Sequence, residues 1–274
     1  MLLCIPLIIK VQYSSNINQY IVFTFNILKS IIKQKRGCEK MKVLIYNEYI
    51  HEKTDPRVTE IYPDGIHNYL KSFIKEDGVQ VDTVTLDTID TITEEKLRET
   101  DVLIWWGHAG HKLVPDETVE LIHKYVLMGM GLIVLHSGHH SKIFIKLMGT
   151  TCHLKWRDGS KERIWTVTPN HPIALGVPET FVLSEEEMYG EMFDIPKPDD
   201  IIFLGWFNTG EVFRSGCTWQ RGHGKIFYFQ PGHETNPSFT KPEVQRIIKN
   251  AVKWACPVNK NIEITCPHFE IPED

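Results

Sequence analysis

The sequence predicts an α/β fold: a flavodoxin-like, doubly wound, mainly parallel sheet whose C-terminal half is richer in strands. Three observations support this prediction. Almost continuously apolar runs, typical of strands buried on both faces, occur at 42–47, 101–106 and 131–135. Segments with apolar residues at helical spacing separate these runs. Strand patterns dominate the later part of the chain. Such alternation predicts parallel strands with right-handed connections and helices on both faces.

The elements of the first half follow from local signals. Gly78 ends the first helical pattern, and Pro115 suits the first turn of a later helix. The run that begins at Gly131 ends abruptly in a polar turn, which resembles the strand–turn–helix geometry that lifts a side chain above a sheet. The predicted elements are strands at 42–47, 79–86, 101–106 and 131–135, and helices at 56–75, 93–99, 115–128 and 141–148.

The second half is predicted to consist mainly of strands. Segments 154–157 and 163–167 could pair with each other across Asp158-Gly159-Ser160, and residues 220–224 form a hairpin turn. Thr240 and Glu243 have the spacing of a capping box, which predicts the start of a final amphipathic helix. The further strands are expected at 181–183, 201–207, 211–219 and 225–229.

The first forty residues differ from the rest of the chain. They have no usable hydrophobic period, and Met1 to Ile9 lacks the basic region and cleavage site of a signal peptide. Lys35-Arg36-Gly37 can be encoded by codons that resemble a ribosome-binding site ahead of Met41. We hypothesise that residues 1–40 are an upstream extension read as protein by mistake, disordered or irregular. The domain then spans 41–256, and 257–274 is a C-terminal tail.

Charge and cysteine content exclude several classes of function. Residues 1–40 hold six basic residues and one acidic residue, so 41–274 carry a net charge of −10, against −5 for the whole chain. An acidic domain without a basic patch argues against nucleic acid or an anionic membrane as a partner. The six cysteines are far apart and form no CxxC pair. We therefore expect reduced thiols and a cytoplasmic location.

Histidines follow three of the predicted strands. His108 comes after the strand ending at Trp106, His136 after the strand ending at Leu135, and His233 after the strand ending near Phe229. Ligands of open α/β sheets bind beyond the carboxyl ends of the strands. If these strands are parallel neighbours, the three histidines face one crevice.

Imidazoles at this density can ligate a metal or move protons near neutral pH. We predict that His136, His233 and one of His108 or His111, with His108 preferred, form a three-nitrogen site, with zinc as the most suitable divalent metal. Glu186 or Glu187 is the expected carboxylate partner, with Glu187 preferred, and Glu234 is predicted to orient His233. The alternative for any single histidine is a hydrogen-bonded turn residue, and this applies to His111, His139 and His140 in particular.

The motifs resemble one known family. Three segments carry most of the resemblance: 105–111 (WWGHAGH), 135–141 (LHSGHHS) and 231–235 (PGHET). Segments 186–191 (EEMYGE) and 210–216 (GEVFRSG) add to it. Together they resemble the trehalose-utilisation (ThuA-like) family over about residues 41–256. That family is similar in fold to class I glutamine amidotransferases.

The resemblance implies a role in the use of trehalose and related disaccharides. His136 stands where an amidotransferase carries its cysteine nucleophile, so glutaminase activity is not expected. Ser137 is one residue away from that position and is a poor candidate for a nucleophile. A metal could polarise the carbonyl of a 3-keto-sugar while His136, His233 or Glu187 moves a proton. The outcome would be isomerisation, elimination or hydrolysis.

The remaining expectations concern the ligand and the partners. A small carbohydrate is the expected substrate, with no nucleotide cofactor. Trp106 and Trp156 could stack on a sugar ring, and we predict that Trp106, His111, His139 and Tyr189 contact the substrate. A sugar oxidoreductase is a possible partner, and a homo-oligomer is possible. The competing hypothesis is a non-catalytic sugar- or metal-binding partner of a sugar dehydrogenase.

Overall fold

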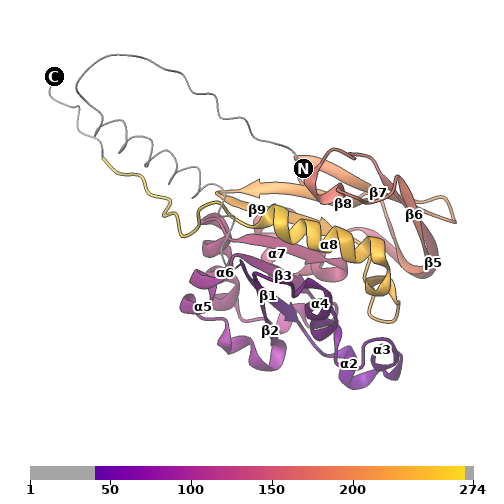
Figure 1. Ribbon diagram of the computed structural model, residues 1–274, viewed down its shortest axis with the longest axis horizontal. Coiled ribbons are helices and arrows are strands. Elements are labelled where there is room, and N and C mark those ends of the chain that lie inside the picture. Colours follow the sequence, from indigo (N-terminus) through magenta and orange to yellow (C-terminus); the bar gives the residue numbers. More distant parts are fainter. Residues whose placement is uncertain (1–40, 269–274) are drawn as a thin grey trace, which may run out of the picture. The chain divides into compact units, whose positions relative to one another are not determined.

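The computed structural model describes residues 41–268 and shows one nine-stranded sheet with helices on both faces (Figure 1). The order of the strands is β2-β1-β3-β4-β9-β8-β7-β5-β6. The predicted α/β fold with a strand-rich C-terminal half is therefore confirmed.

Five neighbouring strands run parallel: β2 (Val79–Thr85), β1 (Met41–Asn47), β3 (Val102–Trp106), β4 (Gly131–Leu135) and β9 (Gly224–Phe229). In register, Trp106 lies beside Leu135, and Leu135 lies beside Phe229. The last residues of β3, β4 and β9 are therefore adjacent at one edge of the sheet. The loops that follow these three strands must leave the sheet side by side.

The other four strands extend the sheet in antiparallel fashion: β8 (Val212–Arg221), β7 (Asp200–Phe207), β5 (Lys155–Thr166) and β6 (Thr180–Gly190). Two expectations for this half are wrong. Segments 154–157 and 163–167 belong to the single strand β5, which pairs with β6 and β7 instead of folding onto itself. Lys241 caps α8 without a side-chain hydrogen bond, so the expected capping box is absent from this helix.

The helices cover the two faces of the sheet in separate sets. Ile66, Leu70 and Ile74 of α4 pack with α8 on one apolar core, whereas α5, α6 and α7 pack on the other. Figure 1 shows α8 lying along the face of the sheet. The helices are α2 (His51–Thr54), α3 (Pro56–Ile61), α4 (Ile66–Ile74), α5 (Glu94–Glu99), α6 (Asp116–Leu127), α7 (Lys142–Met148) and α8 (Pro242–Ala255), with 3₁₀ turns η1 (Leu86–Thr91), η2 (His111–Leu113), η3 (His136–His140), η4 (Pro172–Ala174) and η5 (Ser238–Thr240).

The alternation of side chains along each parallel strand produces these two cores. In β3, Ile104 belongs to one core, and Leu103 and Trp105 belong to the other. Every residue of β3 and β4 is buried. Strands buried on both faces explain the continuous apolar runs of the sequence. Within residues 41–268, the helices are too short or too polar to cross a membrane. The hypothesis about residues 1–40 lies outside the described residues.

Candidate functional site: a histidine and carboxylate centre

The loops after β3, β4 and β9 bring three histidine rings together. The ring centroids of His108 and His233 are 5.3 Å apart, those of His136 and His233 are 5.4 Å apart, and those of His108 and His136 are 6.1 Å apart. Two imidazoles that bind one tetrahedral zinc ion at ordinary Zn–N distances have centroids about 5 Å apart. The three rings are thus close enough to act on one ligand. Together with Glu187 and Glu234, which contact them, we call these histidines the centre.

His136 is the first residue after β4 and is completely buried. Its φ of 50° lies in the left-handed region, which costs energy for a residue with a Cβ. Its Nδ1 lies 2.8 Å from the carbonyl of Gln230, to which it must donate. Its Nε2 is 3.0 Å from Oε2 of Glu187. The tight turn thus points Nε2 of His136 toward the carboxylate of Glu187.

Glu187 and His136 form a buried ion pair. Burial opposes the charged imidazole, but the hydrogen-bonding and charge of Glu187 prevail, so the pKa of His136 is raised. Burial likewise opposes the carboxylate, but His136 and the neighbouring imidazoles outweigh it and lower the pKa of Glu187. Both shifts favour the charged pair at neutral pH.

Glu187 comes from β6, the last strand of the sheet order. The pairing of β5 with β6 shifts register on both sides of the Ser160–Glu186 pair. Such bulges bend a strand and redirect its side chains. The irregular pairing therefore lets β6 bend so that Glu186 and Glu187 lie near the ends of the parallel strands.

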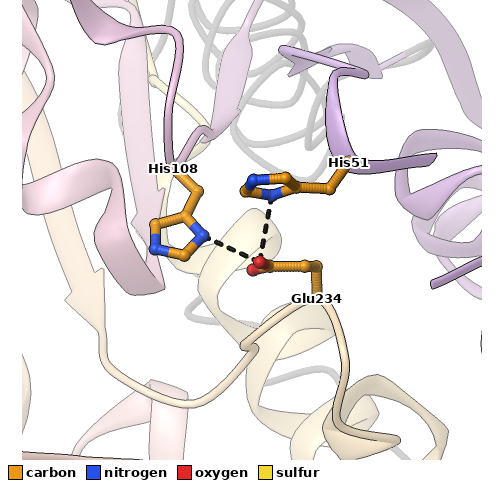
Figure 2. Close-up of side chains that lie close together, drawn as sticks. All are labelled: His51, His108 and Glu234. Carbon is orange, nitrogen blue, oxygen red and sulfur yellow. Dashed lines mark hydrogen bonds and ion pairs between the residues drawn. The ribbon is translucent and has the colours of Figure 1, made fainter. Parts of the chain in front are cut away.

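Glu234 contacts two histidines rather than the one that the sequence indicates. Its Oε1 is 2.9 Å from Nδ1 of His108 and 3.0 Å from Nδ1 of His51 (Figure 2). Nε2 of His233 is 3.8 Å from the same oxygen. Burial would raise the pKa of Glu234, but His108 and His51 lower it strongly. In return, the contact with Glu234 raises the pKa of His51 against the opposing effect of burial. Glu234 thus orients His108 and leaves Nε2 of that ring free.

His233 has a partner for either of its neutral tautomers. Its Nδ1 can accept from the backbone N–H of Thr235 at 3.3 Å, or it can donate to the Thr235 hydroxyl oxygen at 2.9 Å. The first arrangement turns an N–H group toward the centre, and the second turns a lone pair. Burial and the nearby His136 lower the pKa of His233, so the ring is neutral near pH 7.

Two buried glutamates hold the loops that carry these histidines. Glu48, after β1, accepts the backbone N–H groups of His108, Ala109 and Gly110 at 2.7–2.8 Å. Glu186 accepts the N–H groups of Gly232 and His233, and it also accepts hydrogen bonds from the side chains of Asn236 and Ser238. Their carboxylates satisfy backbone donors that a buried loop would otherwise leave unpaired.

Glu48 and His51 belong to the site although no sequence motif indicates them. Both lie in the segment between β1 and α3, where neither a strand exit with glycine nor a repeated histidine marks them. Position after the first parallel strand is the one signal that could have found them, since that exit lies beside the exit of β3.

The residues predicted to contact substrate lie in different environments. Trp106 is completely buried, and its indole nitrogen donates to the carbonyl of Gly232 at 3.0 Å. Its ring belongs to the apolar core and supports the loop that carries His233. Tyr189 stacks on His136 with centroids 5.1 Å apart, and its hydroxyl is 2.9 Å from that of Ser137. His111 and His139 belong to a separate group of histidines described below.

The centre has the side chains that a divalent metal requires. Two sets of three residues place one ligand atom each within 4.8 Å of one another: His51 with His108 and Glu234, and His108 with Glu187 and His233. His136 is outside both sets because its Nε2 faces Glu187. The contact of Glu234 with Nδ1 of His108 is the outer-shell arrangement that fixes a ligating imidazole. The set of His108, Glu187 and His233 therefore fits a metal such as zinc.

Comparison with known proteins agrees with this architecture. The trehalose-utilisation family model (ThuA) matches residues 42–255. The structure is similar to a ThuA-like protein from Bacteroides uniformis, with a TM-score of 0.59 and 18% identity over 80% of this chain and 92% of that one. A ThuA-like protein from Parabacteroides merdae gives a TM-score of 0.58 and 14% identity, with 82% and 93% covered.

A cytoplasmic protein from Salmonella typhimurium is also similar, with a TM-score of 0.56 and 16% identity over 79% of this chain and 100% of that one. At these identities the likeness concerns the fold alone. No curated protein sequence matches the chain significantly. Because the family model spans nearly every element from β1 to α8, the chain belongs to the trehalose-utilisation (ThuA) family.

Proposed function

We propose that this protein is an enzyme of disaccharide use that transforms a carbohydrate bearing a carbonyl group, such as a 3-keto-sugar. The observation that carries the proposal is the buried His136–Glu187 pair, which faces the rings of His108 and His233 at the exits of three parallel strands. Buried ionisable groups with opposed pKa shifts are characteristic of sites that move protons. Family membership supports the sugar as the substrate class.

His108, Glu187 and His233 would hold a divalent metal, with zinc the best match to two imidazoles and a carboxylate. The metal would polarise the sugar carbonyl and so make the adjacent C–H group more acidic. Glu234 keeps His108 in the tautomer whose Nε2 is free. His136 holds Glu187 charged and in place, and Tyr189 stacks on the face of that imidazole with its hydroxyl 3.4 Å from Nε2.

His51 is the best candidate to exchange a proton with substrate at the solvent side. Its side chain is 23% exposed, and the contact with Glu234 raises its pKa from the ordinary value of 6.5. Imidazole is the side chain that most readily gives and takes a proton near neutral pH. We propose a cytoplasmic location and a sugar oxidoreductase as the source of the keto-sugar.

The test is to incubate tag-free protein with a 3-keto-disaccharide and to follow the keto group by NMR, with added zinc or manganese and with a chelator. We expect turnover that the chelator suppresses, and a loss of about 10²–10⁴-fold in Glu187→Gln, since its charge no longer holds His136. Glu185→Gln, an exposed neighbour on β6, is the matched control and should retain full activity. If the wild type binds the sugar and leaves it unchanged with every metal, the protein is a non-catalytic partner instead.

A further inference from the structure

A second group of histidines lies next to the centre. It consists of His111 in η2, His139 and His140 in η3, and His153 just before β5, and we call it the second histidine cluster. His140 and His153 are exposed, His139 is buried, and His111 lies between these extremes. None of its members belongs to the two ligand sets of the centre. The proposed function makes no use of this cluster.

The rings are spaced as ligands of one ion would be. The centroids of His140 and His153 are 5.2 Å apart, and those of His111 and His140 are 6.3 Å apart. The first distance matches the value of about 5 Å for two imidazoles on a tetrahedral zinc ion. The ring centroids of His139 and His140 are 4.1 Å apart, so the buried His139 supports the ring of His140 from the interior.

The nitrogen atoms of the cluster are available as ligands. Nδ1 of His139 donates to the carbonyl of Cys152 at 2.8 Å, which leaves the lone pair on Nε2. Nε2 of His111 is buried without a hydrogen-bond partner among residues 41–268. An unpaired buried nitrogen is costly unless a ligand satisfies it. Two inner nitrogens of the cluster thus have unused bonding capacity.

The charge environment of His111, His139 and His140 differs from that of the centre, whereas the exposed His153 interacts with the carboxylate of Asp194. Burial and neighbouring imidazoles lower the pKa of His111 to about 4, and they lower the pKa values of His139 and His140 as well. No acidic side chain contributes to any of these three shifts. The rings are therefore neutral near pH 7, which is the form that binds a transition metal.

We propose that the second histidine cluster is a separate binding site for a borderline transition-metal ion such as Zn²⁺, with His111, His140 and His153 as ligands. No three of its ligand atoms lie within 4.8 Å of one another in the described part of the chain, so the exposed rings of His140 and His153 must turn to close on the ion. That reorganisation makes this site weaker than the centre. The inference is independent of the proposed function, because the two sites share no residue.

The test is zinc binding to the full chain, tag-free and stripped of metal, measured by competition with a chromophoric chelator. The wild type is expected to bind two equivalents with different affinities. His140→Ala/His153→Ala should lose the weaker equivalent, and His108→Ala should lose the tighter one. His223→Ala is the matched control, since His223 is exposed at the turn before β9, at the opposite end of that strand from the centre. Circular dichroism of each variant checks the fold.

The outcomes separate the two proposals. If the wild type binds one equivalent that His108→Ala abolishes and His140→Ala/His153→Ala retains, the second site does not exist. If the one equivalent disappears only in His140→Ala/His153→Ala, the second site stands and the metal at the centre is wrong. Copper(II) in place of zinc gives an independent readout, because its EPR spectrum should report an all-nitrogen site that the double variant lacks. A mixed nitrogen and oxygen signal unaffected by that variant would overturn the inference.

Discussion

The parallel and antiparallel parts of the sheet contribute to the centre in different ways. In the parallel part, three adjacent strands end at the same edge, so the topology brings His108, His136 and His233 close to one another. In the antiparallel part, one irregular stretch of β6 supplies Glu186 and Glu187. The parallel part thus carries most of the imidazoles, and the antiparallel part supplies charges that hold them. The centre therefore depends on β6, a strand remote from it in the sheet order.

The largest effect should come from removing Glu186, which joins the two parts of the sheet. Glu186→Ala leaves the donors of Gly232, His233 and Ser238 without their acceptor. Each unsatisfied buried donor costs about 1–3 kcal/mol, so we expect a loss of about 3–5 kcal/mol in the free energy of unfolding. Urea denaturation measures it. Glu185→Ala, at the adjacent exposed position, should change it by less than about 0.5 kcal/mol. Equal effects would contradict the role of Glu186.

A smaller effect, on metal affinity and turnover, is expected from changing Glu234 in the parallel part of the sheet. Glu234→Gln keeps the size of the side chain but weakens its contacts with His108 and His51. Loss of an orienting carboxylate costs about tenfold to a hundredfold in metal affinity or activity. Zinc competition and keto-sugar turnover both measure the loss. Unchanged values in both assays would show that His108 needs no orienting partner.

The two histidine groups should also differ in how they respond to pH. Folding lowers the pKa of His111 to about 4, so below pH 6.5 the unfolded chain binds a proton that the folded chain does not. This residue therefore makes the protein less stable as the pH falls, by about 2 kcal/mol at pH 5. Urea denaturation at pH 7 and pH 5 should show a shallower dependence in His111→Gln. The control His223→Gln should follow the wild type, and a His111→Gln profile parallel to it would refute the assignment.

In the pair of His136 and Glu187, the histidine should change the stability with pH in the opposite direction to His111. Because folding raises the pKa of His136, its contribution is fully present below pH 6.5 and disappears as the pH rises through the raised value. Glu187 has a lowered pKa, so its contribution is present above pH 4.5 and is lost at lower pH. The pair is therefore expected to stabilise the fold most between these limits. A Glu187→Gln variant with an unchanged pH dependence would argue against a charged pair.

The smallest effect is expected on the outer face of the antiparallel part. Trp206 on β7 is 50% exposed and lies beside Arg163 and Val212 in register. Trp206→Ser should leave turnover unchanged and alter the free energy of unfolding by about 0.5 kcal/mol or less. A large loss of activity would mean that this part of the sheet contributes more than β6 to the centre.

Sequence patterns could predict the part of the site that topology determines. Apolar runs identify β1, β3, β4 and β9, and histidines at their ends can be expected to meet without knowledge of exact contacts. The partner of Glu234 could not be predicted. Its neighbour in sequence is His233, but in the structure its carboxylate lies closer to His108. The pairing of β5 was also hidden, since its local pattern suits a hairpin as well as a long strand. Contacts that depend on register or on a bulge need the three-dimensional structure.

The most direct test of the account is a double-mutant cycle on His136 and Glu187, measured as keto-sugar kcat/KM for His136→Ala, Glu187→Gln and the combined variant. If the buried pair acts as one unit, each single change should cost about 10²-fold or more, and the combined variant should be no worse than the poorer single one. Losses that multiply would show two independent residues, and full activity in either single variant would contradict the centre proposed for this protein.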